Sequence, residues 1–411
     1  MRVCLLLLAL ASVVRSEAPP DPELVSATRA YLAAADDAAR DDSSSEARSA
    51  KEEAAKGLTP FDALPAREIG RAVRAARTWG EVPSPIEKKL TIAKGEIAYV
   101  ARLPKGYDPA KAYGLLFWIN GPGTDANGAF WTWTPEKLGD AYVVASATMP
   151  ADDPDWPGYP NWDTADQSLE AVLTDICRAV HIDTDRMFAG GFSMGGAFSW
   201  SFAAFQGDRL AGAVPGAGHP PDNASPNCLR NARWCPLFVV HGDKDEAVPI
   251  HLSRDAVKKI KGYGGYSLVY KELKGWGHSW PAQVEEELIA WMGERKRVRD
   301  PKSIFFALGW WVEPKRRFYW ISAVKGSKKG EIEASISGNT ITVKSTQIEV
   351  FALHLNDSLV DLDKEVVVKA NGKEAFRGKV ARSARLALDS FLERWDDEDL
   401  HNARLVVEVP Q

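Results

Sequence analysis

A serine between glycines is the first residue in the sequence whose setting suggests chemistry. Ser193 lies in the run Gly-Phe-Ser-Met-Gly that starts at Gly191, which fits the pattern G-x-S-x-G. The apolar residues 187–189 precede it and a small apolar segment follows, so the run predicts a sharp turn from a buried strand into a helix. At such a turn the serine hydroxyl is exposed as a nucleophile beside helix N–H groups that favour negative charge. A Gly-rich loop without a catalytic role is the alternative.

An acid and a base that could activate this serine follow it in the chain. Three acidic residues come directly after the apolar residues 237–240: Asp243, Asp245 and Glu246. Each is a candidate by type, and a solvated acidic loop is the alternative. His278 follows an expected strand and a glycine that lets the backbone bring the imidazole over the serine. A carboxylate would hold this imidazole in the correct tautomer, and the order serine, acid, histidine is the one that accompanies the G-x-S-x-G turn.

The elements around these candidates must position them. Between residues 87 and 298, short apolar segments alternate with segments whose apolar residues recur at helical spacing. The expected strands are 88–92, 96–103, 114–119, 142–145, 187–189, 210–214, 236–240 and 267–270, and expected helices include 164–180, 253–260 and 284–291. This alternation predicts an α/β domain with a mostly parallel sheet and helices on both faces, whose functional residues lie at the carboxyl ends of the strands.

The regions on either side of this domain have other patterns. Residues 19–86 are rich in alanine and charge, with apolar residues at helical spacing, and predict a helical N-terminal extension. After residue 298 short strands and hairpin turns predict a C-terminal β-rich, sandwich-like domain over 299–411. Residues 1–18 have the basic start, short apolar run and small-residue exit of a secretory signal peptide. We therefore expect a secreted or periplasmic protein with no membrane span after cleavage.

Composition excludes some classes of partner. Of the 411 residues 45% are hydrophobic and 26% charged, as in a soluble globular protein, and the net charge of −5 lacks the basic footprint of nucleic-acid binding. The histidines and cysteines do not have metal-site spacing, and no cofactor is implied. His241 is expected to have a structural role beside the acidic loop. Signal cleavage would leave Cys177, Cys228 and Cys235, and the last two could pair in an exported protein.

From about residue 90 to residue 293 the sequence resembles the α/β-hydrolase superfamily. Within it, the sequence is similar to the secreted esterases grouped with poly(3-hydroxybutyrate) depolymerases, feruloyl esterases and acetylxylan esterases, and to prolyl-oligopeptidase-type hydrolases. The matching segments are Ile-Asp-Thr-Asp-Arg at 182–186, Gly-Phe-Ser-Met-Gly-Gly at 191–196, His-Gly-x-x-Asp-x-x-Val-Pro at 241–249, and Gly-His at 277–278. The resemblance implies Ser193 as nucleophile, Asp245 rather than Asp243 as acid, and His278 as base.

One loop departs from the pattern of these hydrolases. They usually have His-Gly followed by a residue whose N–H completes the oxyanion hole, whereas here residues 120–123 are Asn-Gly-Pro-Gly. Pro122 has no N–H. We expect the N–H of Met194 to donate, and the second donor to be Gly123 or Thr124 after a shift of the loop, or to be missing. Loss of one such donor typically lowers the rate by about 10²–10³-fold.

Aromatic residues could supply a binding surface. Trp131, Trp133 and Trp162 lie in two loops after strand ends, and we expect those loops to rim the site, where the rings could stack on a sugar or phenolic ring. Packing of the loops against one another is the alternative. The C-terminal domain, including residues 356–364, resembles an appendage of such hydrolases in bacterial exported proteins. Contact with carbohydrate or a cell surface through that domain is a further expectation.

These features predict an exported serine hydrolase that cleaves small-molecule or polymer-attached carboxylic esters through an acyl-enzyme on Ser193. One alternative is a serine peptidase of the prolyl-oligopeptidase type, although no propeller-like repeat precedes the catalytic region. The other is a non-catalytic protein that retains the fold and binds through its β-rich domain.

Overall fold

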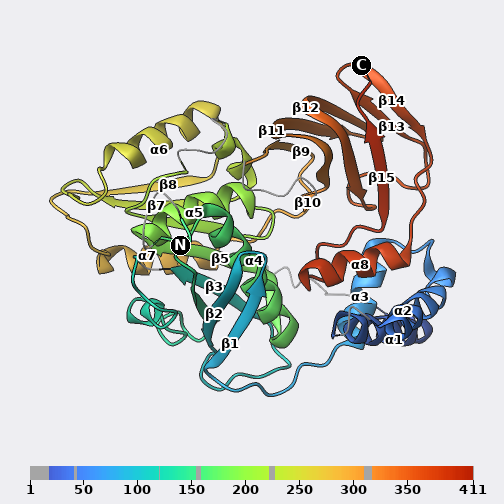
Figure 1. Ribbon diagram of the computed structural model, residues 1–411, viewed down its shortest axis with the longest axis horizontal. Helices are drawn as coiled ribbons and strands as arrows, with labels where there is room; N and C mark the ends of the chain where they lie inside the picture. Colours follow the sequence, from blue (N-terminus) through green and yellow to red (C-terminus); the bar gives the residue numbers. More distant parts are fainter. Residues whose placement is uncertain are drawn as a thin grey trace, which may run out of the picture.

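The computed structural model shows three parts that pack against one another: N-terminal helices, a central sheet with helices, and a C-terminal sheet (Figure 1). It describes residues 18–40, 44–119, 121–153, 159–221, 227–309 and 317–410. The predicted signal peptide lies outside the described residues apart from its last position. Across the described ranges, no helix combines the length and the apolar character that crossing a bilayer requires.

The central sheet has eight strands in the order β1-β2-β4-β3-β5-β6-β7-β8. The pairings of β1 with β2 and of β2 with β4 are antiparallel, and every pairing from β4 to β8 is parallel. The strands are β1 (Ile86–Ile92), β2 (Gly95–Arg102), β3 (Tyr113–Ile119), β4 (Tyr142–Thr148), β5 (Ile182–Phe192), β6 (Gly212–Gly216), β7 (Leu237–Gly242) and β8 (Leu268–Leu273). The predicted mostly parallel sheet is confirmed, and the loops after β5, β7 and β8 meet at one edge.

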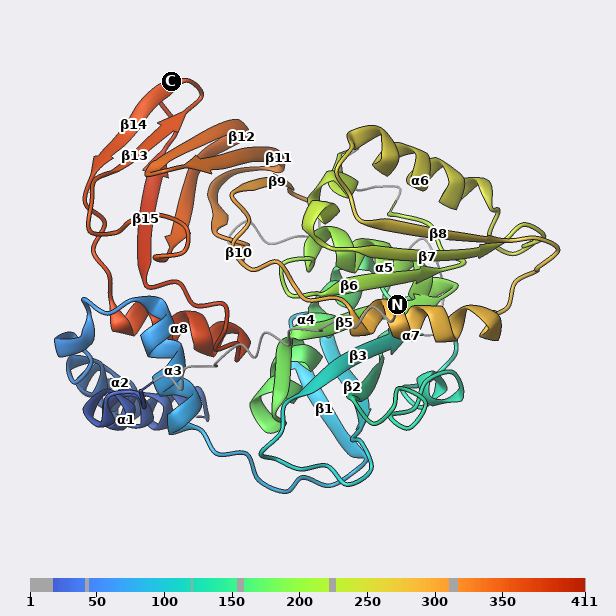
Figure 2. The same ribbon diagram turned by 180° about the vertical axis from the view of Figure 1, so that it is seen from behind.

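Helices cover both faces of this sheet (Figure 1, and from behind in Figure 2). The helices α4 (Trp162–Ala179), α5 (Met194–Phe205) and α6 (His251–Tyr263) pack on one face, and α7 (Glu285–Gly293) packs on the other with the segment that contains the 3₁₀ helix η2 (Gly128–Trp131). Strand β3 shows why both faces are covered, since all of its residues are buried. Leu115 and Phe117 enter the first core, and Leu116 and Trp118 enter the second. A continuous apolar run is what a strand buried on both faces requires.

The C-terminal domain is built on one long hairpin. Strands β11 (Ile321–Ser337) and β12 (Thr340–Leu355) pair along most of their length and have further partners near each end. The other elements are β9 (Ser303–Ala307), β10 (Arg317–Phe318), β13 (Val366–Ala370), β14 (Lys373–Gly378), α8 (Ala384–Arg394) and β15 (Ala403–Glu408). The hairpin turn at Gly338 has a φ of 57°, and Asn371 and Gly372 also have positive φ, as the predicted turn residues permit. The prediction of a separate β-rich domain is confirmed.

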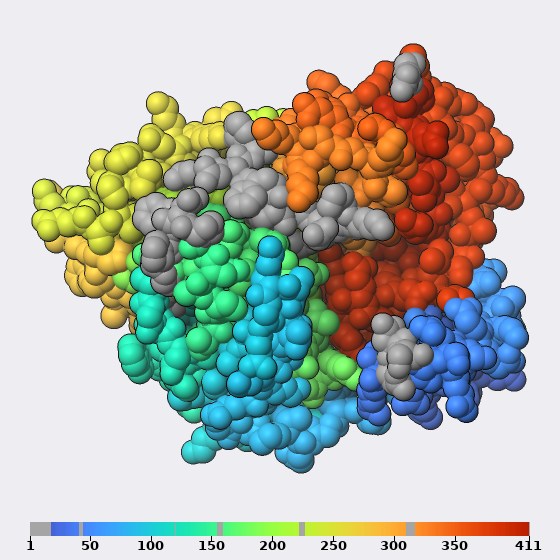
Figure 3. All heavy atoms as spheres, viewed as in Figure 1, coloured from blue at the N-terminus to red at the C-terminus, as the bar shows by residue number. Residues whose placement is uncertain are grey.

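The N-terminal helices pack on this C-terminal domain. The helices are α1 (Pro22–Arg40), α2 (Ser45–Lys56) and α3 (Ala66–Ala76), joined by η1 (Thr59–Phe61). Their apolar faces share one core with α8, to which Tyr31, Ile69, Leu388 and Phe391 contribute buried side chains. In the space-filling view the blue N-terminal helices lie against red C-terminal residues (Figure 3). The predicted extension is therefore helical, and its amphipathic faces are buried against residues more than 300 positions away.

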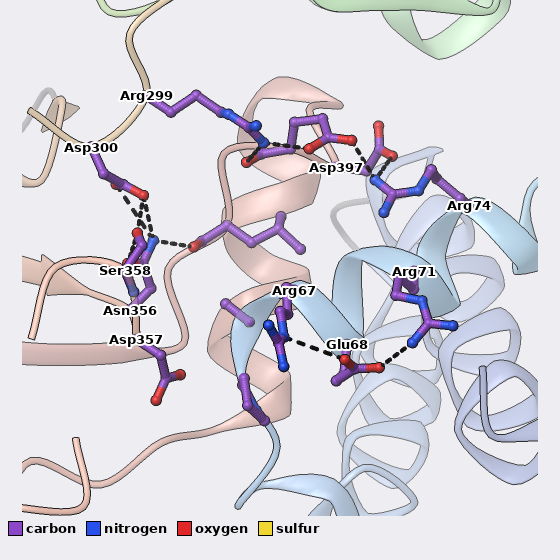
Figure 4. Close-up of a pocket in the computed structure, with 14 residues that line it drawn as sticks. Arg67, Glu68, Arg71, Arg74, Arg299, Asp300, Asn356, Asp357, Ser358 and Asp397 are labelled. Carbon is purple, nitrogen blue, oxygen red and sulfur yellow. Dashed lines mark hydrogen bonds and ion pairs between the residues drawn. The ribbon is translucent and has the colours of Figure 1, made fainter. Parts of the chain in front are cut away.

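A cleft of about 790 Å³ lies between α3 and the C-terminal domain (Figure 4). Arg74 on α3 crosses this boundary to Asp397 at 2.9 Å and to Glu398 at 2.7 Å. Arg71 is paired with Glu68 on its own helix at 2.7 Å. The charged side chains of the cleft therefore satisfy one another and fasten the N-terminal helices to the C-terminal domain.

Buried ion pairs join the C-terminal domain to the central domain. Arg394 of α8 contacts Asp208, which follows α5, at 2.6 Å, and both side chains are almost fully buried. Arg297 contacts Asp396, and its other nitrogen lies 3.2 Å from Asp185. Burial alone would raise the pKa of Asp396, but Arg297 outweighs it and holds the pKa well below its usual value. A buried charge is costly unless it is paired, so these contacts hold the two domains in one arrangement.

Candidate active site

The turn from β5 into α5 aims one hydroxyl at the carboxyl edge of the sheet. Ser193 has φ 61° and ψ −116°, a conformation that non-glycine residues rarely adopt, and α5 starts at the next residue, Met194. The backbone N–H of Ser193 donates to the carbonyl of Gly216 on β6 at 2.9 Å, which anchors the turn. Strained backbone conformations are often found at functional sites, where the surrounding contacts maintain them. In this turn the strained conformation exposes the serine hydroxyl at the start of α5.

The glycines around the serine are required by close packing. A Cβ atom added to Gly195 would lie 1.9 Å from the carbonyl oxygen of Ile119 on β3, and one added to Gly191 would lie 2.3 Å from the same atom. A Cβ atom on Gly196 would lie 2.0 Å from the carbonyl oxygen of Gly216. Such distances are far below van der Waals contact. The G-x-S-x-G-G run therefore lets α5 approach the backbones of β3 and β6.

The three side chains predicted to act together are in hydrogen-bonding sequence. His278 Nε2 lies 3.0 Å from Ser193 Oγ, and His278 Nδ1 lies 2.8 Å from Asp245 Oδ2. The other carboxylate oxygen of Asp245 accepts from the backbone N–H groups of Ala247 at 2.9 Å and Val248 at 2.8 Å. The Asp245 side chain is fully buried and that of His278 is 26% exposed. The arrangement is that of a nucleophile, a general base and an acid that orients the base.

The other acidic candidates of this loop are placed elsewhere. Asp243 Oδ1 accepts from the backbone N–H of Gly275 at 2.5 Å, so this side chain fastens the loop after β7 to the loop after β8. Glu246 is exposed. Residue type alone left the choice between these carboxylates open. The backbone N–H groups of Ala247 and Val248 hold the carboxylate of Asp245 so that its other oxygen faces His278.

A second histidine contacts the same carboxylate from the buried side. His241 Nε2 lies 2.9 Å from the carbonyl oxygen of Val248 and 3.3 Å from Asp245 Oδ2, so the ring hydrogen is on Nε2 and is shared between two acceptors. Its Nδ1 lies 2.7 Å from Ser253 Oγ, whose hydroxyl donates to it. Burial lowers the pKa of His241, which keeps the ring neutral. His241 therefore has a structural role: it closes the loop 245–248 and places its ring beside the acid.

The oxyanion loop approaches the serine at Gly121. A Cβ atom on Gly121 would lie 3.9 Å from Ser193 Oγ, whereas one on Gly123 would meet no atom within 4 Å. Thr124 Oγ1 donates to the carbonyl of Gly121 at 2.7 Å and fixes the turn around Pro122. The structure therefore places Gly121 close to the serine, and the second oxyanion donor stays a prediction. Residue 120 lies outside the described residues.

A cavity of about 330 Å³ opens beside the serine. Trp162 and Phe198 meet edge to face in its wall, with ring centroids 5.1 Å apart. His219, which follows β6, and Leu252 on α6 also line it. The sequence analysis singled out Ser193, Met194 and Trp162 of this lining but not Phe198, His219 or Leu252. The position of His219 just after a strand end follows the rule that functional residues lie at the carboxyl ends of strands. The volume lies at the lower end of small-molecule sites.

Two of the three predicted binding tryptophans do not line this cavity. Trp133 is fully buried, and its ring packs edge-on against Trp118 and Trp280, with centroids 5.6 Å and 6.1 Å away. It belongs to the core on the far face of the sheet, so the prediction that it contacts substrate is wrong. Trp131 is 82% exposed and lies outside the cavity wall. Trp162 alone of the three is placed where the prediction put it.

One cluster has the residue types of a metal site. Asp300, Asp399 and His401 place ligand-type atoms within 4.8 Å of one another, and Asp300 lies beside the cleft of Figure 4. However, Arg317 Nη1 lies 2.9 Å from His401 Nδ1 and 2.9 Å from an Asp399 oxygen. An arginine can only donate, so Nδ1 accepts and the ring hydrogen is on Nε2, toward Asp300. This protonation is unsuited to ligation, and the cluster is an ion-pair network.

The described cysteines are all free. Cys177, Cys228 and Cys235 are buried, and the possible pairing of Cys228 with Cys235 does not occur. Burial raises the pKa of the Cys177 thiol to about 12 and that of Cys228 to about 11. Thiols of this kind are unreactive and act as small apolar core residues.

Comparison with known proteins assigns the central domain. Residues 162–291 match the phospholipase/carboxylesterase family, and this stretch contains Ser193, Asp245 and His278. Together with the sheet order and the nucleophile turn, the match gives the central domain the α/β-hydrolase fold that the sequence predicted.

Several esterases are similar over part of the chain. A probable feruloyl esterase C of Aspergillus terreus is 32% identical over 122 residues, which is 27% of this chain and 43% of that protein. The chain thus spans less than half the length of that curated relative. A thermostable esterase of known structure is 24% identical, with 52% of this chain and 63% of that chain covered and a TM-score of 0.43. A ferulic acid esterase from Anaeromyces mucronatus is 17% identical, with 53% and 93% covered and a TM-score of 0.43.

Proposed function

We propose that the protein hydrolyses carboxylic esters through an acyl-enzyme on Ser193. The observation that carries this proposal is the unbroken series of hydrogen bonds from Ser193 Oγ through the imidazole of His278 to the buried carboxylate of Asp245. A serine in a strained turn at a helix start, with a base at 3.0 Å, is equipped for acyl transfer.

The chemistry follows from these contacts. His278 Nε2 accepts the hydroxyl proton as Ser193 Oγ attacks the ester carbonyl, and Asp245 stabilises the imidazolium that forms. We expect the N–H of Met194, at the start of α5, to donate to the carbonyl oxygen as it gains negative charge. His278 then gives its proton to the leaving alkoxide, and the alcohol departs. Water attacks the acyl-enzyme with His278 again as base, which releases the carboxylic acid and restores the serine.

The cavity beside Ser193 suits an aromatic or short acyl group. Its walls carry the edge-to-face pair of Trp162 and Phe198 and the aliphatic side chain of Leu252. A planar ring would pack against these side chains. Relatives named as feruloyl esterases support an aryl ester as the substrate class to examine first.

Replacement of the nucleophile tests the proposal. The wild-type chain should hydrolyse p-nitrophenyl acetate and methyl ferulate and should be labelled by a fluorophosphonate, and Ser193→Ala should lose both properties while it keeps its thermal midpoint. Asp243→Asn is a matched control, because it changes a nearby carboxylate that does not contact the imidazole. Ester turnover by Ser193→Ala at the wild-type rate would contradict the assignment.

Assays on the same purified protein distinguish the esterase from the peptidase and from the non-catalytic binding protein. A peptidase of the prolyl-oligopeptidase type would cleave a chromogenic peptide amide faster than the corresponding ester. A non-catalytic protein would resist the fluorophosphonate although its serine is accessible. The strained serine and the complete triad favour an enzyme over a non-catalytic protein, and the match to the phospholipase/carboxylesterase family favours an ester as substrate.

The location of the protein and its contact with carbohydrate are also proposals. The composition of residues 1–18 supports export, and N-terminal sequencing of the protein from a periplasmic or culture-medium fraction would give a start near residue 19. Polymer-attached esters are proposed substrates. Contact with carbohydrate through the C-terminal domain is supported by a polar groove on that domain, described next.

A further inference from the structure

A groove of about 590 Å³ runs between the C-terminal sheet and the central domain, away from the residues of the catalytic cavity. Its floor is the outer face of β9, β11 and β12. Glu333 on β11 pairs with Phe305 on one side and Lys344 on the other, and two positions along, Ser335 pairs with Ser303 and Thr342. Side chains alternate along a strand, so these residues share the face opposite to the buried core residues.

The central domain supplies the wall. Arg230 and Arg233 come from the 3₁₀ helix η3 (Cys228–Trp234), and Tyr263 and Tyr266 come from the end of α6 and the residues after it. The two tyrosine rings lie 5.8 Å apart, and the guanidinium of Arg230 lies 3.7 Å over the ring of Phe305. The groove therefore has aromatic faces, hydroxyl groups and guanidinium groups on adjoining surfaces.

The charge of the groove is opposite to that of the whole chain. Arg230, Arg233 and Lys344 line it against a single acid, Glu333, in a protein whose net charge is −5. Arg230 is 3.8 Å from Glu333. Within the described part of the chain, Arg233 and Lys344 have no ion-pair partner. Two cations held at a groove without counter-charges create a local potential that attracts an anionic ligand.

The two sides of the groove are fixed to each other. The buried amide of Asn231 donates to the carbonyl of Ala307 at 3.0 Å and accepts from the N–H of Ala307 at 2.8 Å. Trp234 Nε1 donates to the carbonyl of Ser303 at 2.6 Å. These bonds join η3 to the edge of β9, so a ligand would meet a preformed surface and would not have to order it.

We propose that this groove binds an acidic saccharide chain, one whose sugar rings carry carboxylates. The apolar faces of sugar rings fit the tyrosines, and the sugar hydroxyls fit the serine and threonine side chains of the floor. Sugar carboxylates fit the guanidinium fork of Arg233 on the wall and the ammonium group of Lys344 on the floor. A saccharide is favoured over a peptide because Ser303, Ser335 and Thr342 give the floor a row of hydroxyl partners.

If the protein is the esterase proposed above, the groove indicates that its substrates are esters carried on acidic saccharide chains. His219 lines the catalytic cavity and Asn227 lines the groove. Eight peptide units separate them, so their Cα atoms lie at most about 29 Å apart. A saccharide chain held in the groove would keep an ester on the same polymer within reach of Ser193.

Direct binding measurements test the groove. Calorimetry with a tetragalacturonate should show binding to the full chain that weakens with added salt, and neutral xylo- or cello-oligosaccharides should bind at least tenfold more weakly. The double variant Arg233→Gln, Lys344→Gln should lose at least tenfold in affinity. Lys328→Gln with Lys329→Gln removes two exposed cations from β11 that lie outside the groove. This control variant should change the affinity by less than twofold.

The outcomes separate the groove from the catalytic proposal. Ser193→Ala should bind tetragalacturonate as the wild-type chain does, whether or not the wild type hydrolyses esters. Absence of tetragalacturonate binding to the wild type, equal binding of neutral oligosaccharides, or an unchanged affinity of the double variant would overturn the groove. Tighter binding of single-stranded DNA than of tetragalacturonate would also overturn it, because the groove would then be a general polyanion surface.

Discussion

Replacement of His241 should lower the catalytic rate although this residue does not contact substrate. Asp245 Oδ2 accepts a hydrogen bond from His278 at 2.8 Å and lies 3.3 Å from His241 Nε2, and its other oxygen accepts two hydrogen bonds from the backbone. His241→Asn removes the ring nitrogen Nε2 and leaves an amide that reaches only as far as Nδ1. His241→Gln places an amide N–H where Nε2 lies, so it keeps the bond toward the acid.

The magnitude follows from these contacts. The N–H of His241 Nε2 closes the loop 245–248 through the carbonyl of Val248, so its loss lets the acid and the imidazole that it orients move out of position. Misplacement that raises the barrier by about 1.4 kcal/mol corresponds to a roughly tenfold loss in kcat for His241→Asn. KM should change little, because His241 does not line the substrate cavity. His241→Gln should stay within about threefold of the wild type.

The pH profile distinguishes positioning from simple support of the fold. A carboxylate that has lost one donor holds positive charge on the neighbouring imidazole more strongly, so the acidic limb of kcat/KM against pH should move to higher pH in His241→Asn and stay in place in His241→Gln. Rates are normalised to active sites titrated with a fluorophosphonate, and thermal midpoints are recorded in parallel. Equal losses in both variants, or a loss in His241→Asn that disappears on normalisation, would refute this reasoning.

Three further outcomes follow from the packing and the charges. Gly195→Ala should prevent soluble folding, because its Cβ atom would lie 1.9 Å from a backbone oxygen, whereas Gly262→Ala, which meets nothing within 4 Å inside α6, should raise stability by about 0.5–1 kcal/mol in urea titrations. Asp300, whose burial is outweighed by the neighbouring His401 ring and by hydrogen bonds from Ser358 and Asn356, has its pKa lowered to about 2. Its contribution of about 2 kcal/mol should be complete above about pH 4 and lost as the pH falls toward 2, and a denaturation series that is flat over this range would contradict it. Trp162→Ala should reduce kcat/KM for an aryl ester at least tenfold and for p-nitrophenyl acetate by less than threefold, and equal losses would remove Trp162 from the acyl site.

The nucleophile turn could be predicted because its constraint is local. Side chains at Gly191, Gly195 and Gly196 would clash with neighbouring backbone, so these positions must be glycine. Because the three glycines lie within six residues of one another, the sequence shows this requirement directly. The sheet could be predicted for a similar reason, since runs such as that of β3 are apolar without interruption. The triad needed one further rule, that residues after parallel strands meet at one edge, and it placed Asp245 and His278.

Predictions that depended on how loops fold back were less accurate. Trp133 and Trp131 are two residues apart, yet one is fully buried and the other is 82% exposed, because the segment with η2 turns inward over the far face of the sheet. Thr124 fixes a tight turn that brings Gly121 close to the serine, and residue type does not reveal this turn. Amphipathic helices also do not specify their partner, so the packing of α1 and α3 on α8 could not be read from the pattern.

The ion pairs between the domains bear on how the site works as a unit. Asp208 ends the loop after the nucleophile helix α5, and its buried carboxylate is matched by Arg394 from the C-terminal domain at 2.6 Å. If residues 87–298 stood alone, this carboxylate would lack its partner, and a buried charge left unpaired typically costs about 3–5 kcal/mol. The C-terminal domain is therefore required to complete the core beneath the nucleophile turn. A domain that must dock there for stability also holds the floor of the charged groove at a constant distance from Ser193, which is the geometry that presentation of a polymer-attached ester needs.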